Sequence, residues 1–418
     1  MKSNLIFWFL NIFIISIFGI FAYDPADIVI LGPKFEQEKY FIQELDQIAN
    51  ELNIKIKYES VSDPETTLIK SDNNIYSIAL IPNPQGVVNL ANRNIIYDLD
   101  NLTIDNIPIE ELYPKHLNQI VSYEEKIYGG WLRLFPNSLI WYDVSKLNSH
   151  PDINLDNFDE LIQYTNKLAD NSISSWCLHS ESAVSSGWIQ TNWLEDILLT
   201  KYGTKVYDKW SKLEISASSI EVFQSVSLIG EIVFYPNHLQ GGYRSVNDKE
   251  FSTLPLFLLN DNNDCFLSWG GHYFSNYIPD SYIYEKDYGV VKFPKITYEN
   301  SIVGVGDNIV LIKNDQLAQE VITRILSKEF GEIWSSHDDS QFIPVNPSFD
   351  SRKIKNKLTL YEFEIIHDAL KEDLFRYDAS ELMDRPIGAD KLLKFFVEYL
   401  YSGKDSLVSL LNNLDKEY

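Results

Sequence analysis

The chain has 418 residues and a formal net charge of −25 at pH 7, with 45% hydrophobic and 23% charged residues. This is the composition of a folded chain, and its length allows two domains. The negative charge, without any basic run, excludes nucleic acid and anionic membrane surfaces as partners. The two cysteines exclude a disulfide-rich scaffold and leave one bridge, Cys177 with Cys265, if the compartment is oxidising.

The N-terminal segment has the form of a secretory signal. Lys2 precedes an apolar stretch over residues 5–22, and a polar Asp-Pro pair follows it. We expect cleavage after Ala22, which makes residues 1–22 the signal peptide. An uncleaved membrane anchor is the alternative, because a run of this length almost spans a bilayer. No cysteine lies near the cleavage site, so we expect export without a lipid anchor.

The first part of the mature chain alternates strand-like and helical patterns. Apolar runs at residues 27–31 and 77–81 have the form of buried strands, and residues 54–58 alternate apolar residues with lysine. Helical spacing of apolar residues is found at residues 41–52 and 87–94. This order predicts an α/β layer around a mostly parallel sheet.

The rest of the chain continues in the same way. Helical spacing is found at residues 158–169, 192–199, 220–232, 317–330, 358–375 and 389–401, and strand-like runs are found at residues 139–142, 287–293 and 302–312. No internal repeat, low-complexity tract or long linker is present in the sequence. If the chain forms two lobes, it therefore crosses between them through short strands rather than through a tether.

The sequence lacks catalytic signatures. The serine-hydrolase, P-loop, zinc-protease and dinucleotide-binding motifs are absent, apart from a lone Gly304-Val-Gly306 within a strand pattern. His337-Asp-Asp339 is interpreted as a solvated turn rather than a metal site. Adjacent carboxylates such as Glu195 and Asp196 do not indicate a glycosidase, because that pair is defined by its spatial separation. We expect a protein that is not an enzyme and has no metal or cofactor.

Aromatic residues make up 14% of the chain and give the positive signal. An indole face stacks on the apolar face of a pyranose, while Asp, Asn, Glu and Arg bind the hydroxyl rim. Trp188 and Trp193 flank Asn192 and precede two carboxylates. For a single tryptophan, burial in the core is the commoner outcome. Trp131, Trp188 and Trp269 adjoin glycines in turn-like contexts, which favours a binding role for them.

Several segments resemble the extracellular solute-binding proteins of carbohydrate ABC transporters, and specifically their α-glucoside-binding branch. The resemblance covers nearly the whole mature chain. It is densest at residues 175–182 (SWCLHSES), 186–197 (SGWIQTNWLEDI), 206–210 (VYDKW), 241–244 (GGYR), 264–267 (DCFL), 305–307 (VGD) and 375–383 (FRYDASELM). Each segment alone is a weak signal, but their order and spacing together are a strong one.

The resemblance implies a two-lobed periplasmic-binding-protein fold of α/β class, with a hinge and an interlobe ligand cleft. We expect residues 23–135 and 308–345 in lobe 1, residues 136–307 in lobe 2, and a C-terminal helical segment at residues 346–418 that packs on both lobes. The crossings would fall near residues 134–138 and 304–308. The resemblance also implies a disulfide between Cys177 and Cys265 within lobe 2.

The ligand contacts that the resemblance implies are Asp63, Asn83, Gln85, Trp188, Asn192, Gly242, Arg244, Asp307, Arg376 and Asp378, to which we add Trp131 and Trp269 as stacking platforms. Some positions depart from the pattern of the family. Relatives usually have Asp at the position of Asn192 and Arg at that of Trp269, and Asp384-Arg385 replaces a usual Pro. The Asn192 change weakens one charge-assisted bond, and the Trp269 change trades a charged contact for stacking.

The implied function is that of a monomeric periplasmic receptor. It would capture a small α-glucoside, such as glucosylglycerol, sucrose or trehalose, and deliver it to the permease subunits of an ABC importer. A receptor for a non-sugar solute such as a polyamine stays open, because polyamine sites also use aromatics and carboxylates. Arg244 and Arg376 in the expected cleft argue against a cationic ligand. A secreted carbohydrate-active enzyme is the other alternative.

Overall fold

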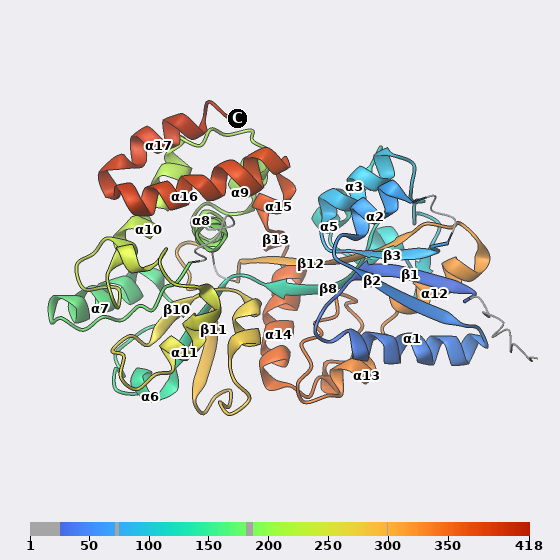
Figure 1. Cartoon of the computed structure of the whole chain (residues 1–418), viewed down its shortest axis with the longest axis horizontal. Coiled ribbons are helices and arrows are strands. Elements are labelled where there is room, and N and C mark those ends of the chain that lie inside the picture. Colours follow the sequence, from blue (N-terminus) through green and yellow to red (C-terminus); the bar gives the residue numbers. More distant parts are fainter. Residues whose placement is uncertain (1–25, 72–74, 181–186, 299) are drawn as a thin grey trace, which may run out of the picture.

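The computed structural model of the chain describes residues 26–71, 75–180, 187–298 and 300–418. The expected signal peptide, residues 1–22, lies outside the described residues. Across the described ranges, no helix combines the length and apolar character needed to span a bilayer. The chain forms two α/β lobes that lie side by side, with strands running between them (Figure 1). The two-lobed fold predicted from the resemblance is confirmed.

The sheet of lobe 1 has the strand order β13-β12-β3-β1-β2, and β8 pairs with β12. The strands are β1 (Ile28–Pro33), β2 (Ile56–Val61), β3 (Ile78–Ile81), β8 (Gly130–Pro136), β12 (Ile302–Leu311) and β13 (Phe375–Tyr377). The pairs β1–β2, β1–β3 and β12–β13 are parallel, whereas β12 runs antiparallel to β3 and β8. The expectation of a mostly parallel sheet therefore fails at β12, because this long strand enters lobe 1 from lobe 2.

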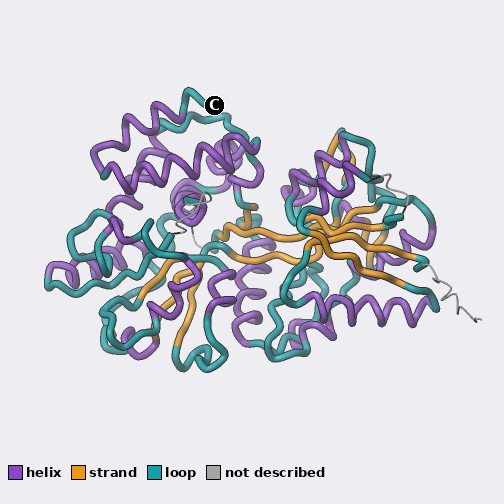
Figure 2. Tube along the Cα trace, in the orientation of Figure 1, coloured by secondary structure: helices purple, strands orange, loops and turns teal. Residues whose placement is uncertain are grey.

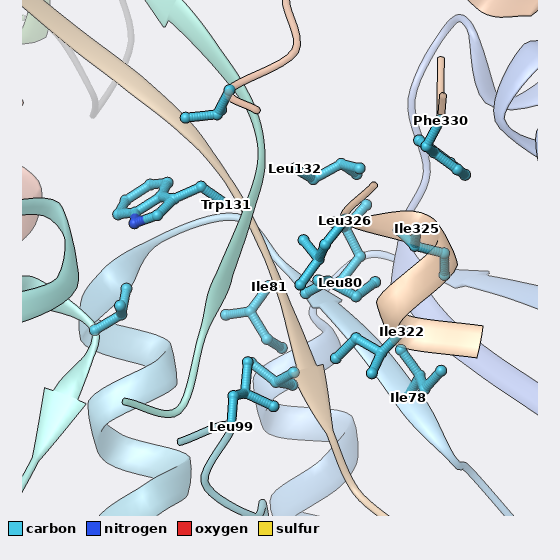
Figure 3. Packing of buried hydrophobic residues seen from close by; sticks show 14 of the residues in the cluster. Ile78, Leu80, Ile81, Leu99, Trp131, Leu132, Ile322, Ile325, Leu326 and Phe330 are labelled. Carbon is cyan, nitrogen blue, oxygen red and sulfur yellow. The ribbon is translucent and has the colours of Figure 1, made fainter. Parts of the chain in front are cut away.

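Helices cover both faces of this sheet (Figure 1). One face carries α1 (Glu38–Leu52), α12 (Gln316–Ile325) and α13 (Glu332–Ser335), and the other carries α2 (Pro64–Lys70), α3 (Pro84–Asn92) and α5 (Lys115–Ile120). Phe41, Leu45 and Ile48 of α1 are buried, as their helical spacing predicted. Figure 3 shows the core between sheet and helix, where β3 residues such as Leu80 approach Ile322 and Ile325 of α12.

Lobe 2 consists mainly of helices around a small antiparallel sheet (Figure 2). The sheet has the order β10 (Leu267–Trp269), β9 (Leu139–Asp143), β11 (Tyr288–Lys292). Its helices include α7 (Phe158–Asp170), α8 (Trp188–Tyr202), α9 (Thr204–Ser211) and α10 (Ile220–Val233). Cys177 and Cys265 form a disulfide inside the core of this lobe, with Cα atoms 5.4 Å apart, as the resemblance implied.

The C-terminal segment divides between the two cores. Residues from α14 (Lys357–Lys371) and β13 belong mainly to the core of lobe 1, whereas α15 (Ala379–Leu382), α16 (Leu392–Ser402) and α17 (Leu407–Leu414) contribute to that of lobe 2. The helix predicted at residues 358–375 ends early, because Asp373 adopts a left-handed φ of 56° and Phe375 starts β13 beside Ile302. The chain thus crosses between the lobes at Asp378, in addition to the two crossings predicted from the sequence.

Short elements complete the described part of the chain. They are β4 (Thr103–Ile104), β5 (Ile107–Pro108), α4 (Ile109–Leu112), β6 (Ser122–Tyr123), β7 (Lys126–Ile127), α6 (Val144–Leu147), α11 (Leu254–Leu258), 3₁₀ turns at Tyr243–Ser245, Phe251–Thr253, His272–Tyr277, Ser351–Lys353 and Lys404–Ser406, and a wide helical turn at Pro386–Lys391. The wide turn leads into α16, which therefore begins later than the predicted residue 389.

Candidate functional site

A cavity of about 720 Å³ lies between the lobes. Lobe 1 contributes Glu65, Asn83, Gln85, Gly86, Val88, Asn89, Asn92 and Tyr123 to its lining; Trp188 and the segment around α15 and α16 contribute Ser380, Glu381, Met383, Arg385, Gly388, Ala389 and Leu393. The volume is within the range of small-molecule sites, and the lining combines an aromatic platform with polar side chains. Three of the predicted contacts, Asn83, Gln85 and Trp188, come together here.

The wall from lobe 1 is built on helix N-termini. Asn83 caps α3, and its Oδ1 accepts a hydrogen bond of 2.7 Å from the backbone N–H of Gly86. Pro84 occupies the first turn of α3, which fixes the backbone where Gln85 lines the cavity. The cap and the proline are local features of the sequence, whereas the prediction that Asn83 and Gln85 contact a ligand comes from the resemblance.

Asp63 lies beside the cavity but does not line it. It caps α2, where its Oδ1 accepts from the N–H of Thr66 at 2.9 Å. This backbone hydrogen bond lowers the pKa of Asp63, and the positive charge of Arg385 lowers it further. Arg385 lines the cavity, whereas Asp63 does not, so the predicted ligand contact at Asp63 stays a prediction.

Trp188 forms the wall from lobe 2 at the start of α8. It is half-buried, and its ring lies 4.7 Å from that of Tyr273 and 5.7 Å from that of Phe251. The preceding Gly187 has a φ of 101°, and a Cβ there would lie 2.3 Å from the carbonyl oxygen of Leu393. Only glycine allows the chain to turn into α8 at this point and present Trp188 to the cavity.

A smaller pocket of about 230 Å³ adjoins the main cavity. It is lined by Phe35, Glu36, Gln37, Arg133, Phe135, Asn137, His272, Tyr273, Asn276, Val305 and Gln341, which belong to both lobes and to the crossings. Tyr273 lines this pocket while its contact partner Trp188 lines the main cavity. The two hollows therefore lie on either side of this aromatic pair, and together they are called the interlobe cleft below.

Asp378 and Asn192 are buried and line neither hollow. Asp378 accepts hydrogen bonds from the hydroxyl of Ser380 at 2.6 Å and from the amide of Asn137 at 3.3 Å. With its amide nitrogen donating, Asn192 reaches Asp378 Oδ2 and the carbonyl of Trp188, both at 3.2 Å. Burial raises the pKa of Asp378. The structure thus brings these two predicted contacts together in one hydrogen-bond network.

Glu381 joins this network from the side of the main cavity. Its carboxylate accepts from the hydroxyl of Tyr377 at 3.2 Å. Burial, with the nearby charge of Asp378 as a second cause, raises the pKa of Glu381 to about 8. The carboxyl group is therefore largely protonated at neutral pH and can donate a hydrogen bond to a ligand as well as accept one.

Asp307 lies beside the smaller pocket. It is buried, and it forms an ion pair with Nε of Arg133 across the irregularity in the β8–β12 register. The guanidinium of Arg133 lies 4.4 Å from the ring centre of Phe35 and 5.0 Å from that of Phe135. Asp307 therefore orients an arginine that lines the pocket, an arrangement in which the charge pair is largely shielded from solvent.

Two of the predicted contacts lie elsewhere, and a third borders the main cavity. Arg376 lines a second interlobe cavity of about 520 Å³ near α5 and α9, which shares Gln85 and Met383 with the main cavity, and its Nε pairs with Asp208 at 2.6 Å. Gly242 and Arg244 lie at the 3₁₀ turn Tyr243–Ser245, where the exposed Arg244 donates to the hydroxyl of Tyr243 at 3.3 Å. Neither of them lines the cleft in the described structure.

Trp131 and Trp269 are core residues, each 1% exposed, so neither is retained as a stacking platform. Trp131 projects from β8 opposite to Leu132 and donates to the carbonyl of Leu117 (Figure 3). Its neighbour Gly130 lies in strand β8 and not in a turn. Glycine is needed there for close packing, because a Cβ would lie 2.4 Å from Leu326. Trp269 stacks on Trp193 at 5.2 Å.

Several lining residues had no signal in the sequence reasoning. Tyr273 is separated from the Gly270-Gly271 pair by His272, so the pattern of an aromatic residue beside a glycine does not indicate it. Phe135 and Arg133 lie on a strand that reads as core, and their exposure to the pocket depends on the crossing geometry. Arg385 was noticed only as a departure from the family.

Metal ligation has no basis in the described residues, because no group of three or more His, Cys, Asp or Glu side chains among them is arranged to hold an ion. His337 instead stacks on Tyr40 with ring centres 3.9 Å apart, and the hydroxyl of Tyr40 donates to Asp339 at 2.8 Å. The interpretation of this His-Asp-Asp segment as a turn agrees with its conformation.

Two proteins of known name are similar in sequence over nearly the full length. The osmoprotective compounds-binding protein GgtB of Synechocystis sp. is 23% identical over 400 residues, which cover 94% of this chain and 93% of GgtB. The alpha-glucosides-binding periplasmic protein AglE of Rhizobium meliloti is 23% identical over 395 residues, which cover 91% of this chain and 84% of AglE. No protein-family model matches the chain.

Solved structures share the fold. The bacterial solute receptor AcbH superposes with a TM-score of 0.70 at 12% identity, covering 93% of this chain and 97% of AcbH. The apo form of RafE from Streptococcus pneumoniae gives a TM-score of 0.68 at 13% identity, covering 94% and 97%. A chitin oligosaccharide binding protein gives 0.67 at 12% identity, covering 93% and 98%. At these identities the likeness concerns the fold.

Proposed function

We propose that this chain, a solute-binding protein of the carbohydrate ABC-transporter type, captures a small α-glucoside in its interlobe cleft and delivers it to membrane permease subunits. The observation that carries the proposal is the main cavity itself, in which Trp188 of lobe 2 faces the polar side chains Asn83 and Gln85 of lobe 1. An indole face and polar groups on opposite walls match the apolar face and hydroxyl rim of a pyranose.

The names of the two sequence relatives support the ligand class. One is described as binding osmoprotective compounds and the other as binding alpha-glucosides. Within that class we propose glucosylglycerol, sucrose or trehalose, since these neutral ligands suit a lining of amides, carboxyls and one arginine. We further propose that the protein acts as an exported periplasmic monomer.

The mechanism that we propose is capture by lobe closure. Because the walls of the cavity come from different lobes, a ligand that contacts both favours the arrangement in which the lobes are close. Hinge closure of periplasmic binding proteins is a known instance of this behaviour. The ligand shifts the equilibrium only by the contacts it makes better in the closed form. The closed form would then be the one recognised by the permease.

A polyamine is the second candidate ligand. Glu65 lines the main cavity, and so does Glu381, which is largely protonated at neutral pH. Carboxylates and aromatic rings together bind alkylammonium groups well. Arg385 in the same cavity and Arg376 in the neighbouring one favour a neutral ligand over a cation, although the exposed Arg244 lines neither.

Calorimetric titration of the purified protein decides between these ligands. We expect saturable binding of at least one of glucosylglycerol, sucrose and trehalose, without any product formed on prolonged incubation, and no binding of putrescine or spermidine. Binding of a polyamine alone would replace the proposed ligand. Release of glucose from any of the sugars would overturn the assignment as a receptor in favour of a carbohydrate-active enzyme.

A further inference from the structure

Two adjacent carboxylates on α8 are buried away from the cleft. Glu195 is 0% exposed and Asp196 is 1% exposed. They lie two turns along the helix from Trp188. Burial raises the pKa of both groups well above the ordinary values. Such burial is unfavourable unless the oxygens receive hydrogen bonds, so the partners of these two side chains indicate what they do.

Glu195 holds the crossing that runs from β13 into α15. Its Oε2 accepts from the backbone N–H of Ala379 at 3.0 Å, and its Oε1 accepts from that of Ser380 at 3.2 Å. The hydroxyl of Tyr207 also donates to Oε2, at 2.9 Å. The first N–H groups of a helix have no acceptor within that helix. At the start of α15, a side chain from a helix of lobe 2 accepts from two of these groups.

Asp196 holds the other two crossings. Its Oδ1 accepts from the hydroxyl of Ser138, the residue that joins β8 to β9, and its Oδ2 accepts from the indole N–H of Trp269 at 2.6 Å. The hydroxyl oxygen of Ser138 in turn accepts from the backbone N–H of Val303 in β12 at 2.8 Å. One carboxylate therefore connects α8 with the first crossing directly and with the second through Ser138.

We propose that Glu195 and Asp196 are positioning residues that fix all three interlobe crossings to α8, and that α8 thereby couples ligand contact to the geometry of the hinge. The helix carries the proposed ligand contacts Trp188 and Asn192 in its first turns. Its residues from Ile189 to Thr200 are buried, so the helix is packed firmly into lobe 2. The part that concerns ligand rests on the proposed function.

Other ionisable groups face this cluster from each packed element. They are Tyr207 on α9, Tyr377 on β13, Asp378 at the crossing, Glu381 on α15 and Tyr273 in the turn His272–Tyr277. The charge of Asp378 disfavours ionisation of Glu195 and Asp196, and their hydrogen-bond donors favour it. The buried acids accept hydrogen bonds from donors that belong to the crossings. Removing one of these acids therefore leaves backbone N–H groups of a crossing without an acceptor.

The test uses Glu195→Gln. The N–H groups of Ala379 and Ser380, which donate to Glu195, belong to the backbone and cannot reorient. In the glutamine variant an NH₂ group replaces one carboxylate oxygen, so one of these N–H groups loses its acceptor. Glu44→Gln is the matched control, because Glu44 is also a buried helical carboxylate that accepts from the start of a short helix, at the N–H of Trp334 (2.8 Å), but it lies within lobe 1. Asp196→Asn should be milder, since the Ser138 hydroxyl can rotate.

Hydrogen exchange measured without ligand tests whether Glu195 holds the crossing, independently of ligand binding. We expect the amides of Ala379 and Ser380 to exchange at least about tenfold faster in Glu195→Gln than in Glu44→Gln, at equal global stability. Equal exchange in both variants would overturn the proposal. If Glu195→Gln does not fold, Tyr207→Phe, which removes a donor to Glu195, replaces it with the same expected contrast.

Small-angle scattering with and without a bound glucoside tests the coupling between ligand binding and lobe closure. In the wild type and in Glu44→Gln we expect the radius of gyration to fall on saturation. In Glu195→Gln we expect a smaller fall even at saturation, although Trp188 is unchanged. Full closure in Glu195→Gln would contradict the coupling. Failure of every glucoside to bind the wild type would instead refute the proposed function and leave the exchange result to be judged separately.

Discussion

The ring of Tyr273 lies edge-on to the ring of Trp188, with centroids 4.7 Å apart and planes inclined by 62°. Edge-to-face packing places the positive ring edge against the negative ring face, which holds both rings in a fixed orientation. One ring lines the main cavity and the other lines the smaller pocket. The contact therefore fixes part of the wall of each hollow.

Trp188→Ala should weaken glucoside binding by at least about tenfold, because hot-spot aromatics lose both stacking and burial on truncation. Trp188→Phe should lose less, since a ring remains. Calorimetry measures both. Tyr401→Ala is the control, because Tyr401 is 58% exposed on α16 and lies outside the cleft. An affinity of Trp188→Ala equal to that of the control would show that the indole does not contact the ligand.

Removal of the disulfide should destabilise the protein strongly. Cys177 and Cys265 are separated by 88 positions, and closing a loop of that size in the unfolded chain corresponds to about 4 kcal/mol. We expect the double Cys177→Ala, Cys265→Ala variant to lose about this much free energy of unfolding in a urea titration. Mass analysis of the oxidised wild type should find no free thiol. Two free thiols in the exported protein would contradict the bridge.

Stability should fall as the pH rises from about 5 to 8.5. The pKa of Glu381 is raised from 4.5 to about 8, so the folded state holds this proton where the unfolded state has lost it. The resulting stability is present below pH 4.5 and is lost as the pH rises through 8. Each unit of pKa difference corresponds to about 1.4 kcal/mol, and we expect a loss on the order of 2 kcal/mol after relaxation.

Urea titrations of the wild type across this pH range measure the effect, and Glu381→Gln identifies its source. The variant cannot ionise at this position and should show a clearly shallower decline. An unchanged slope in Glu381→Gln would show that this carboxyl group does not titrate as described.

Gly187→Ala should destabilise the start of α8 by about 3 kcal/mol, because the left-handed backbone and a collision with Leu393 act together. Gly242→Ala separates the two effects. Gly242 has a φ of 76°, but a Cβ there meets no atom within 4 Å, so we expect a loss of only about 1 kcal/mol. Thermal unfolding compares them. Equal losses would mean that the contact with Leu393 relaxes without cost.

The fold was largely predictable because its signals are local or cumulative. The spacing of Phe41, Leu45 and Ile48 determined α1, and Asn83 with Pro84 determined the start of α3. The resemblance, carried by many short segments in order, determined the two lobes and the disulfide. Element ends were less predictable. The strand at Phe375 was assigned to a helix, because pairing with Ile302 lies 73 positions away and outweighs local propensity.

The candidate site was predictable only in part. Asn83, Gln85 and Trp188 line the main cavity, since each lies at a helix start that the sequence marks with Pro or Gly. The prediction of Trp131 as a stacking platform was wrong. Gly130 beside it allows close packing against Leu326, and local sequence does not distinguish such a glycine from a turn glycine. The partner of a side chain, and not its type, decided the role.

The sequence by itself determined the class of protein, the helix starts that carry polar caps, and the identity of the aromatic and acidic residues available for binding. Only the tertiary structure decided which of them meet. Glu195 and Asp196 look like any exposed acidic pair in the sequence, yet α8 carries them into the interior, where the three crossings supply their hydrogen-bond donors. The physical reason is that burial and partners depend on contacts between distant segments, which residue type and spacing along one segment do not specify.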